Sequence, residues 1–325
     1  MKKISTLLIV ASMLLTFAAC SGEDNETPTD GGTQEQGGQD SNNNHEDNGN
    51  ANNGGGTEEL EPITGAIQVI TRDPGSGTRD AFVSAFDVRD EEGDNIRDEA
   101  QVQISTGGLI GQVVANPQSI GYVSIASLDP TADFRGVAID GVVPSAENIT
   151  NGTYTAFREF NIFVIEDELS EPAQDFIDFI LSNEGQAIAE DIVGVRSPDA
   201  TGEDYAGGGL GGSLSIDGSS SIESLMRGLV EAYELLNPDM SIDFNSSSSS
   251  AGVSGATEGR VDIGMVSREF REGSDPDNLT AIPIAIDGVA VIVHADNPLQ
   301  SLTTAQVREI FIHDGNYTTW EQVNP

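Results

Sequence analysis

The chain has 325 residues, and its 54 acidic residues outnumber its 14 lysines and arginines, giving a formal net charge of −40. A surface this acidic argues against a nucleic-acid partner, because phosphate backbones are bound through basic patches. It also argues against long-range steering of a small anion, so an anion site here must rely on local hydrogen bonds and a few arginines.

Residues 1–20 have the pattern of a secretory signal. Two lysines precede an apolar run at residues 4–17, which is too short to span a membrane, and Ala-Ala-Cys follows. This ending resembles the lipobox of bacterial lipoproteins, with Phe17 where leucine is more usual. The resemblance implies that Cys20, the only cysteine, is the lipidated first residue of the mature protein. The alternative is a chance thiol in a discarded peptide.

Residues 21–61 read as an acidic stalk. They are rich in Asn, Gly, Gln, Thr, Asp and Glu, contain no lysine or arginine, and have almost no apolar side chains. Such a segment buries too little surface to offset the entropy cost of ordering, so we expect a disordered tether.

The remaining residues, 62–325, alternate strand and helix patterns, which is typical of layered α/β folds. In the first half we expect strands at 67–71, 121–125 and 161–165, and helices at 77–86 and 173–184. A linker rich in Gly, Asp and Pro follows at 197–212. In the second half we expect strands at 214–216, 241–245, 261–266 and 288–294, and helices at 222–233, 254–258 and 303–311.

Two of these strand-to-helix junctions are rich in serine and glycine. One contains Arg72, Ser76, Gly77 and Thr78, and the other is the run of small residues at 218–221. The free N–H groups of a helix start, together with nearby hydroxyls and the helix dipole, form a site for an anion. Two such junctions predict an oxyanion held between two facing lobes, whereas ordinary helix capping is the alternative interpretation.

Several of these motifs resemble those of a known family, the phosphate-binding lipoproteins of bacterial phosphate ABC transporters. The segment Thr-Arg-Asp-Pro-Gly-Ser-Gly-Thr-Arg-Asp-Ala-Phe at 71–82 resembles a signature of the second half of these proteins, as do residues 121–124, 140–144 and 176–186. Features of the family's first half come afterwards, at residues 218–221, 237–238, 246–250, 259–264, 287–291, 296–298, 302–305, 310–311 and 320.

The two halves are therefore exchanged, and the chain resembles a circular permutant in which residues 197–212 join the family's two ends. The alternative is a pair of half-proteins from a tandem chain, or halves swapped between molecules. The resemblance implies a two-lobed α/β fold like that of type II periplasmic binding proteins, with ligand in the cleft. One lobe would be residues 62–161 plus 288–325, and the other would be residues 162–287.

The resemblance also implies the ligand contacts. Positions that match phosphate-binding residues of the family are Arg72, Ser76, Gly77, Thr78, Ser220 and Ser221, with Ser248 or Ser249 as the contact from the serine tract. Arg268 stands where a well-known version of the family has an aspartate that accepts the phosphate's proton. Arg268 would either bind the anion directly or be a surface arginine. Asp80 and Asp287 are candidate substitute acceptors, so the choice between phosphate and sulfate stays open.

No catalytic or metal-binding set is evident. The histidines, His45, His294 and His313, have no metal-ligand spacing, and residues 75–78 lack the lysine of a phosphate loop. We expect a non-enzymatic, monomeric protein without cofactor or metal, anchored on the extracytoplasmic face of the cell membrane. It would bind inorganic phosphate for delivery to a membrane permease. The alternatives are a binding protein for another oxyanion such as sulfate, a phosphate-sensing or adhesion module, and an exported phosphohydrolase.

Overall fold

The computed structural model describes residues 61–91 and 93–323, which belong to one compact unit, Thr57–Pro325. The predicted signal, the predicted lipidation site Cys20 and residues 21–60 of the predicted stalk lie outside the described residues. Within the described part, no helix is both long enough and apolar enough to cross a membrane.

The strands alternate with helices along the chain, as the sequence predicts. The strands are β1 (Gln68–Arg72), β2 (Arg89–Asp90), β3 (Gly93–Asp94), β4 (Gln101–Gln103), β5 (Ser119–Ser124), β6 (Phe134–Gly136), β7 (Ala138–Ile139), β8 (Phe157–Val164), β9 (Gly211–Gly218), β10 (Asp239–Phe244), β11 (Ile263–Val266), β12 (Thr280–His294) and β13 (Ser301–Leu302). The helices are α1 (Gly77–Ala85), α2 (Thr106–Ala115), α3 (Ala146–Thr150), α4 (Glu171–Leu181), α5 (Asn183–Ile192), α6 (Glu223–Leu236), α7 (Ser249–Thr257), α8 (Thr304–Phe311) and α9 (Trp320–Val323), with short 3-10 turns η1 (Ile125–Ser127) and η2 (Glu166–Glu168).

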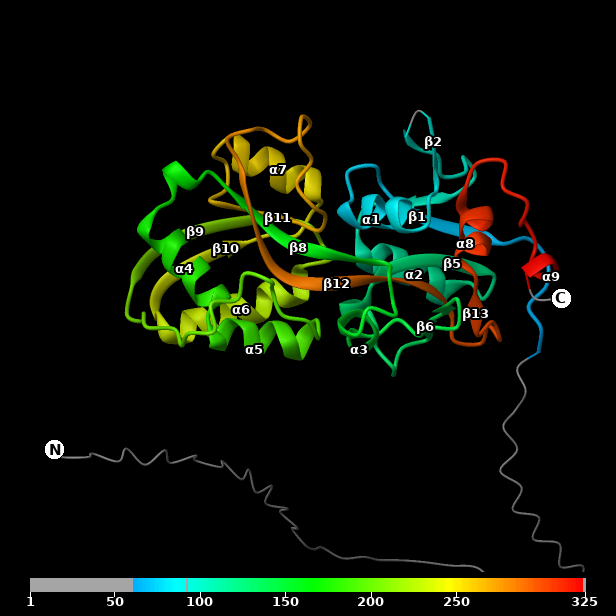
Figure 1. The fold of residues 1–325 in the computed structure, drawn as a ribbon, viewed down its shortest axis with the longest axis horizontal. Helices are drawn as coiled ribbons and strands as arrows, with labels where there is room; N and C mark the ends of the chain where they lie inside the picture. Colours follow the sequence, from blue (N-terminus) through cyan, green and yellow to red (C-terminus); the bar gives the residue numbers. More distant parts are fainter. Residues whose placement is uncertain (1–60, 92, 324–325) are drawn as a thin grey trace, which may run out of the picture. The chain divides into compact units, whose positions relative to one another are not determined.

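One curved sheet runs through the described part of the chain in the order β10-β9-β11-β8-β12-β5-β1-β4, and β6 pairs with β12. The outer pairs β9–β10, β9–β11, β1–β5 and β1–β4 are parallel, whereas β8 and β12 pair antiparallel with each other and with their neighbours. The long strands β8 and β12 extend from one group of helices to the other, so they connect two lobes (Figure 1).

Each lobe has its own hydrophobic core. The first core gathers Val69, Phe82, Tyr122, Val291, Phe311 and Trp320, and the rings of Phe82 and Tyr122 stack with centroids 4.0 Å apart. The second core gathers Phe160, Phe176, Leu214, Met226, Tyr233 and Ile284. Strand β12 contributes to both cores, because Ile284 lies in the second and Val291 in the first. The predicted two-lobed α/β fold is therefore confirmed.

Segments that are far apart in the sequence share each core. Val69 of β1 and Phe311 of α8 share a core, although more than 200 residues separate them. Phe176 of α4 and Leu214 of β9 share the other. The helix predicted at 173–184 ends earlier, as α4, because Ser182 terminates it. A second helix, α5, which was not predicted, follows at once, and the Ser182 side chain caps it by accepting from Gly185 N at 3.3 Å.

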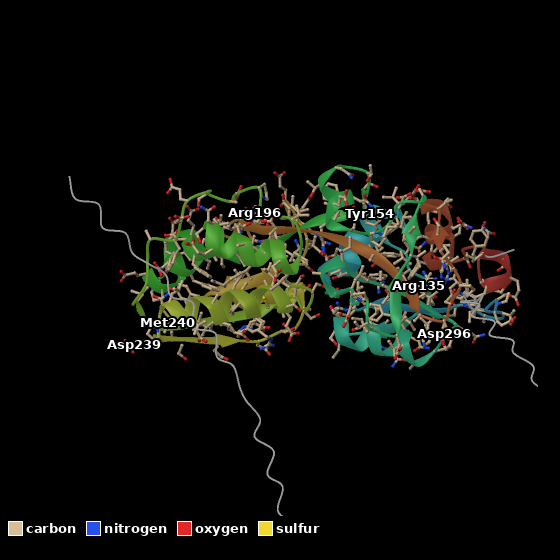
Figure 2. The ribbon with its side chains drawn as sticks, turned by 90° about the horizontal axis from the view of Figure 1, so that it is seen from below. Arg135, Tyr154, Arg196, Asp239, Met240 and Asp296 are labelled. Atoms are coloured by element: carbon tan, nitrogen blue, oxygen red, sulfur yellow. The ribbon has the colours of Figure 1, made fainter. Side chains whose placement is uncertain are left out.

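The predicted linker, residues 197–212, packs on the second lobe. Tyr205 Oη donates to Asp175 Oδ2 at 2.5 Å, and Leu210 N donates to Asn237 Oδ1 at 2.9 Å. In the first lobe, the labelled side chain of Tyr154 is buried and its Oη donates to the Val289 carbonyl at 2.8 Å (Figure 2). This bond fastens the segment before β8 to β12 where the two lobes meet.

Candidate functional site

Four helices begin where the lobes touch. In the first lobe, Ser76 caps α1 and Ser105 caps α2, because their side chains accept from Arg79 N and Gly108 N. In the second lobe, Ser248 caps α7 by accepting from Ala251 N, and the turn Ser219–Ser221 leads into α6. The positive ends of these helix dipoles lie on the two sides of one seam, an arrangement that favours a bound anion.

Hydroxyl groups of both lobes meet in this seam. Thr78 Oγ1 and Ser221 Oγ form a hydrogen bond between the lobes, and so do Thr106 Oγ1 and Ser220 Oγ at 3.2 Å. Within the second lobe, Ser219 Oγ donates to Ser267 Oγ at 2.7 Å, and Ser267 N donates to Ser249 Oγ at 3.1 Å. We call this set the hydroxyl cluster: Thr78, Thr106, Ser219, Ser220, Ser221, Ser249 and Ser267.

The backbone of α1 also reaches across the seam. Gly77 N donates to Ser249 Oγ at 3.2 Å. A Cβ atom on Gly77 would lie 2.5 Å from Ser249 Oγ and 2.6 Å from Ser267 Oγ, which is far inside van der Waals contact. Only glycine allows the two lobes to approach this closely, so its N–H group lies within the hydroxyl cluster.

Arg72, the last residue of β1, places its guanidinium beside the cluster. The side chain is buried, with Nη1 donating to Thr106 Oγ1 at 3.3 Å and Nη2 donating to the Ile104 carbonyl at 3.2 Å. Burial lowers the pKa of Arg72 from its usual value, and the carboxylate of Asp73 opposes this shift. The group stays charged at neutral pH, because arginine does not lose its proton in proteins.

The structure places the other predicted site residues as follows. Ser76 caps α1 at the seam, and Ser220 and Ser221 belong to the hydroxyl cluster. In the serine tract, Ser249 belongs to the cluster, whereas the side chain of Ser248 is used as the cap of α7.

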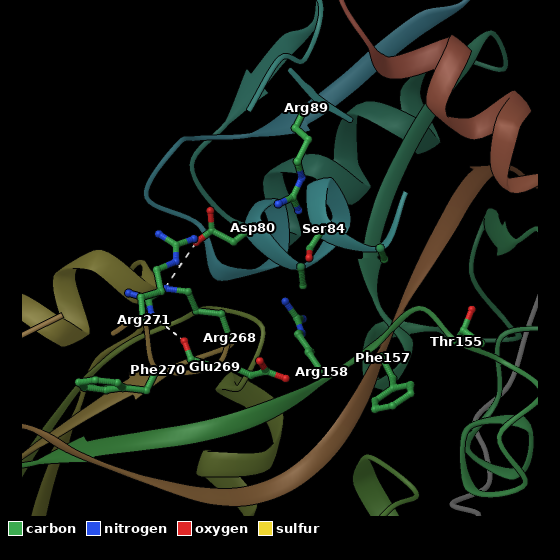
Figure 3. Close-up of a pocket in the computed structure, with 12 residues that line it drawn as sticks. Asp80, Ser84, Arg89, Thr155, Phe157, Arg158, Arg268, Glu269, Phe270 and Arg271 are labelled. Carbon is green, nitrogen blue, oxygen red and sulfur yellow. Dashed lines mark hydrogen bonds and ion pairs between the residues drawn. The ribbon is translucent and has the colours of Figure 1, made fainter. Parts of the chain in front are cut away.

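Arg268 lies apart from the hydroxyl cluster, in an ion-pair network. Its Nη1 and Nη2 donate to the two carboxylate oxygens of Asp275 at 2.6 and 2.7 Å, and its Nε lies 3.5 Å from Asp80 Oδ2. It lines a pocket of about 390 Å³ beside the seam, between α1, β8 and residues 268–271, which Figure 3 shows. Its hydrogen bonds thus go to the protein itself, to the Asp275 carboxylate and to the Glu269 carbonyl.

The two candidate acceptors, Asp80 and Asp287, are also paired. Asp287 is buried, and its Oδ2 accepts from Arg158 Nε and Nη2 at 3.2 and 3.0 Å, whereas its Oδ1 accepts from Ser124 Oγ at 2.7 Å. Asp80 Oδ2 lies 2.6 Å from Arg271 Nη2 and 3.5 Å from Arg268 Nε, and Figure 3 shows the three side chains together. Both carboxylates therefore already have cationic partners within the protein.

The sequence analysis did not identify Thr106 as a site residue, and it did not predict that Ser219 and Ser267 belong to the hydroxyl cluster. Thr106 N donates to Ser220 Oγ at 3.2 Å, so the start of α2 is a third strand-to-helix junction at the seam. The signal was present in the run Ser105-Thr106-Gly107-Gly108, which has the same small residues before an apolar helix. No group of three or more His, Cys, Asp or Glu side chains that could hold a metal ion occurs among the described residues.

Comparisons with known proteins agree with this architecture. A family model described as a PBP superfamily domain matches residues 45–184 and 202–325. Phosphate-binding protein PstS 2 of Streptococcus pneumoniae is 40% identical over 266 residues, which cover 80% of this chain and 88% of that protein. The crystal structure of a phosphate-binding protein of a phosphate ABC transporter from the same species is similar, with a TM-score of 0.61 and 38% identity. That match covers 80% of this chain and 100% of the other.

Another relative matches over a shorter stretch. Phosphate-binding protein PstS of Pseudomonas aeruginosa is 35% identical over 113 residues, which cover 32% of this chain and 34% of that protein. The 266-residue match is longer than either half of this chain and therefore includes both, whereas the 113-residue match is about as long as the second half alone.

Proposed function

The chain belongs to the PBP superfamily, and on this premise we propose that it binds inorganic phosphate outside the cytoplasm and delivers it to the permease of an ABC transporter. The observation that carries the proposal is the seam itself. Four helix N-termini, the hydroxyl cluster and Arg72 supply hydrogen-bond donors from both lobes to one place. A tetrahedral oxyanion has acceptor oxygens in four directions, which such a site can satisfy simultaneously.

Local hydrogen bonds suffice for this binding despite the acidic surface. A hydrogen bond to a charged group contributes about 1.5–3 kcal/mol, so several convergent ones account for at least micromolar affinity. The ligand contacts in this proposal are Arg72, Ser76, Gly77, Thr78, Ser220, Ser221 and Ser249. Ser248 contributes through the start of α7, and Arg268 acts beside the site rather than within it.

We further propose that the protein binds without turnover and is monomeric, with Cys20 as its lipid anchor on the extracytoplasmic face of the cell membrane. The relatives are named as binding proteins of transport systems, which supports binding without catalysis. The residues that would carry the anchor, 1–20, match the lipobox pattern in sequence.

We infer that the order of segments is a circular permutation within one chain. Segments that share a lobe here are far apart in sequence, and residues 197–212 connect two segments of the second lobe. The short match to the Pseudomonas protein supports an exchange relative to that protein, because a match that follows chain order includes only one half when the halves are exchanged. The 266-residue match to the Streptococcus protein includes both halves, which supports the same order of segments in that relative. In this proposal one lobe is residues 62–161 plus 288–325, and the other is residues 162–287.

The test is isothermal titration calorimetry of the purified protein with phosphate at neutral pH. We expect saturable one-to-one binding, no release of phosphate from phosphate esters, and a monomer by light scattering. No heat at millimolar phosphate would overturn the proposed function. Hydrolysis of esters would favour the phosphohydrolase alternative instead. A dimer that exchanges residues 62–196 would overturn the permutation within one chain and leave the binding function standing.

A further inference from the structure

The seam contains one carboxylate whose hydrogen-bonding capacity is incompletely used, that of Asp73. We propose that Asp73 accepts the proton of bound phosphate and so makes the site reject sulfate. This inference rests on the proposed function and names the residue that sets its selectivity. The problem it addresses is chemical: at neutral pH phosphate carries at least one proton, whereas sulfate carries none.

A site made only of donors cannot separate the two anions. Arginine and backbone N–H groups donate only, so they serve sulfate and phosphate equally. Hydroxyl groups can donate or accept, so those of the hydroxyl cluster adapt to either anion. An ionised carboxylate only accepts. It binds the O–H group of phosphate and repels the bare oxygen of sulfate, and this repulsion provides the selectivity.

Asp73 has the required free acceptor. Its Oδ2 accepts from Gly75 N at 3.2 Å, whereas its Oδ1 is buried and has no hydrogen-bond partner among the residues that the structure describes. Leaving such a group unpaired in a protein interior costs free energy, so an unpaired oxygen calls for an explanation. The O–H group of a protonated oxyanion would supply the missing donor.

The position of Asp73 is consistent with its proposed role as the acceptor of the phosphate proton. Oδ1 lies 3.6 Å from Nη2 of Arg72, whose Nη1 contacts Thr106 in the hydroxyl cluster. The backbone holds the residue on both sides, because Asp73 N donates to the Gln103 carbonyl at 3.1 Å and its own carbonyl accepts from Ser76 N at 3.0 Å. Asp73 therefore sits between the guanidinium and the start of α1.

Three other acidic side chains near the seam, Asp80, Asp275 and Asp287, are held by arginines. Asp287 accepts from Arg158 and Ser124. Asp80 pairs with Arg268 and Arg271. Arg268, where the resemblance puts the acceptor of one version of the family, holds Asp275 through two hydrogen bonds. Each of these carboxylates would have to give up a contact of 2.6 to 3.0 Å with an arginine to accept a proton, whereas Asp73 Oδ1 makes no hydrogen bond and would give up only its 3.6 Å ion pair with Arg72.

The test measures three dissociation constants, for phosphate, arsenate and sulfate, in the wild type and in Asp73→Asn. Arsenate carries a proton at neutral pH as phosphate does, so both should lose about tenfold to a hundredfold in affinity, the value of one charge-assisted hydrogen bond. Sulfate should bind no more weakly than before, so the ratio of sulfate to phosphate affinity rises. Asp73→Glu, which keeps a carboxylate, should keep the wild-type order of the three anions.

The matched control is Asp80→Asn, which also removes one carboxylate next to the seam. It should change all three affinities by the same factor and leave their ratio unaltered. If Asp73→Asn fails to fold, Asp73→Ser provides a second neutral variant. If these variants bind phosphate with the wild-type ratio of sulfate to phosphate affinity, the inference about Asp73 is wrong, but the proposed function still stands. No phosphate binding by the wild type would overturn the proposed function and this inference with it.

Discussion

Asp80 and Arg268 face each other between the lobes, with Arg268 Nε 3.5 Å from Asp80 Oδ2. Asp80 belongs to α1 of the first lobe, and Arg268 follows β11 of the second. Arg271 adds a second cation 2.6 Å from the same oxygen, and Asp275 holds Arg268 in place. Arg268, which the sequence analysis named as a possible contact of the anion, is thus part of an ion-pair network that links the lobes (Figure 3).

Asp80→Asn should weaken phosphate binding by a small factor. The variant removes an attraction that exists only when the lobes are in contact, so the closed form loses stability relative to an open one. Because Arg271 is about half exposed, solvent screens the pair, and we expect about a two- to fivefold loss of affinity. Calorimetry at low and high salt checks this, since the loss should shrink as salt rises.

The control for Asp80→Asn is Arg260→Gln, which breaks the exposed pair with Glu258 inside the second lobe. It should leave the phosphate affinity unaltered. An equal loss in both variants would mean that overall charge, rather than the contact between the lobes, sets the affinity.

Arg72→Ala should reduce the phosphate affinity by at least about a hundredfold, since it removes a buried, charged donor with two N–H groups near the anion. Ser76→Ala should cost less, because it removes one neutral hydroxyl. Titration calorimetry gives the affinities, and circular dichroism checks that both variants fold. Wild-type affinity in both would show that the anion binds elsewhere.

Gly77→Ala should prevent the lobes from closing on the ligand. The new Cβ would meet Ser249 Oγ at 2.5 Å and the Ser267 carbonyl carbon at 2.9 Å, and the second of these atoms is backbone that cannot rotate away. Small-angle scattering should show a decrease in radius of gyration with phosphate for the wild type and none for the variant. Gly107→Ala, near the start of α2, meets no atom within 4 Å and should behave like the wild type.

We expect the stability of the protein to depend on pH through Asp275. Burial acts to raise its pKa, but the hydrogen bonds from Arg268 and from Arg271 N act against burial, and the net result is a pKa below 3.8. A lowered folded-state pKa means that the stabilisation is present above the unfolded value and is lost as pH falls through the folded one. Arg268→Gln should therefore destabilise the protein by about 3 kcal/mol at neutral pH, because it leaves a buried carboxylate without its cation.

Urea unfolding from pH 7 to pH 3 measures this difference. The difference in free energy of unfolding between the wild type and Arg268→Gln should become smaller below pH 4, as Asp275 takes up its proton in both proteins. A gap that stays constant over this range would show that the cost comes from packing against Phe163, over whose ring the guanidinium lies, and not from the ion pair.

The sequence by itself determined the elements and the first half of the site. The apolar spacing of strands and helices depends on neighbours along the chain, so many elements could be predicted. Short elements such as β4 and α3, and the ten-residue helices α2 and α5, were missed. Arg72, Ser76 and Gly77 could be assigned to an anion site because a strand, a turn of small residues and a helix are local patterns.

The tertiary structure alone decided which side chains meet between the lobes. Thr106 contacts Ser220, which lies 114 residues away, and Arg268 turns to Asp80 and Asp275. Within the serine tract, Ser249 rather than Ser248 joins the hydroxyl cluster, because α7 begins after Ser248. Such contacts depend on strand order and on how closely two cores approach, and no local pattern of residues encodes either quantity.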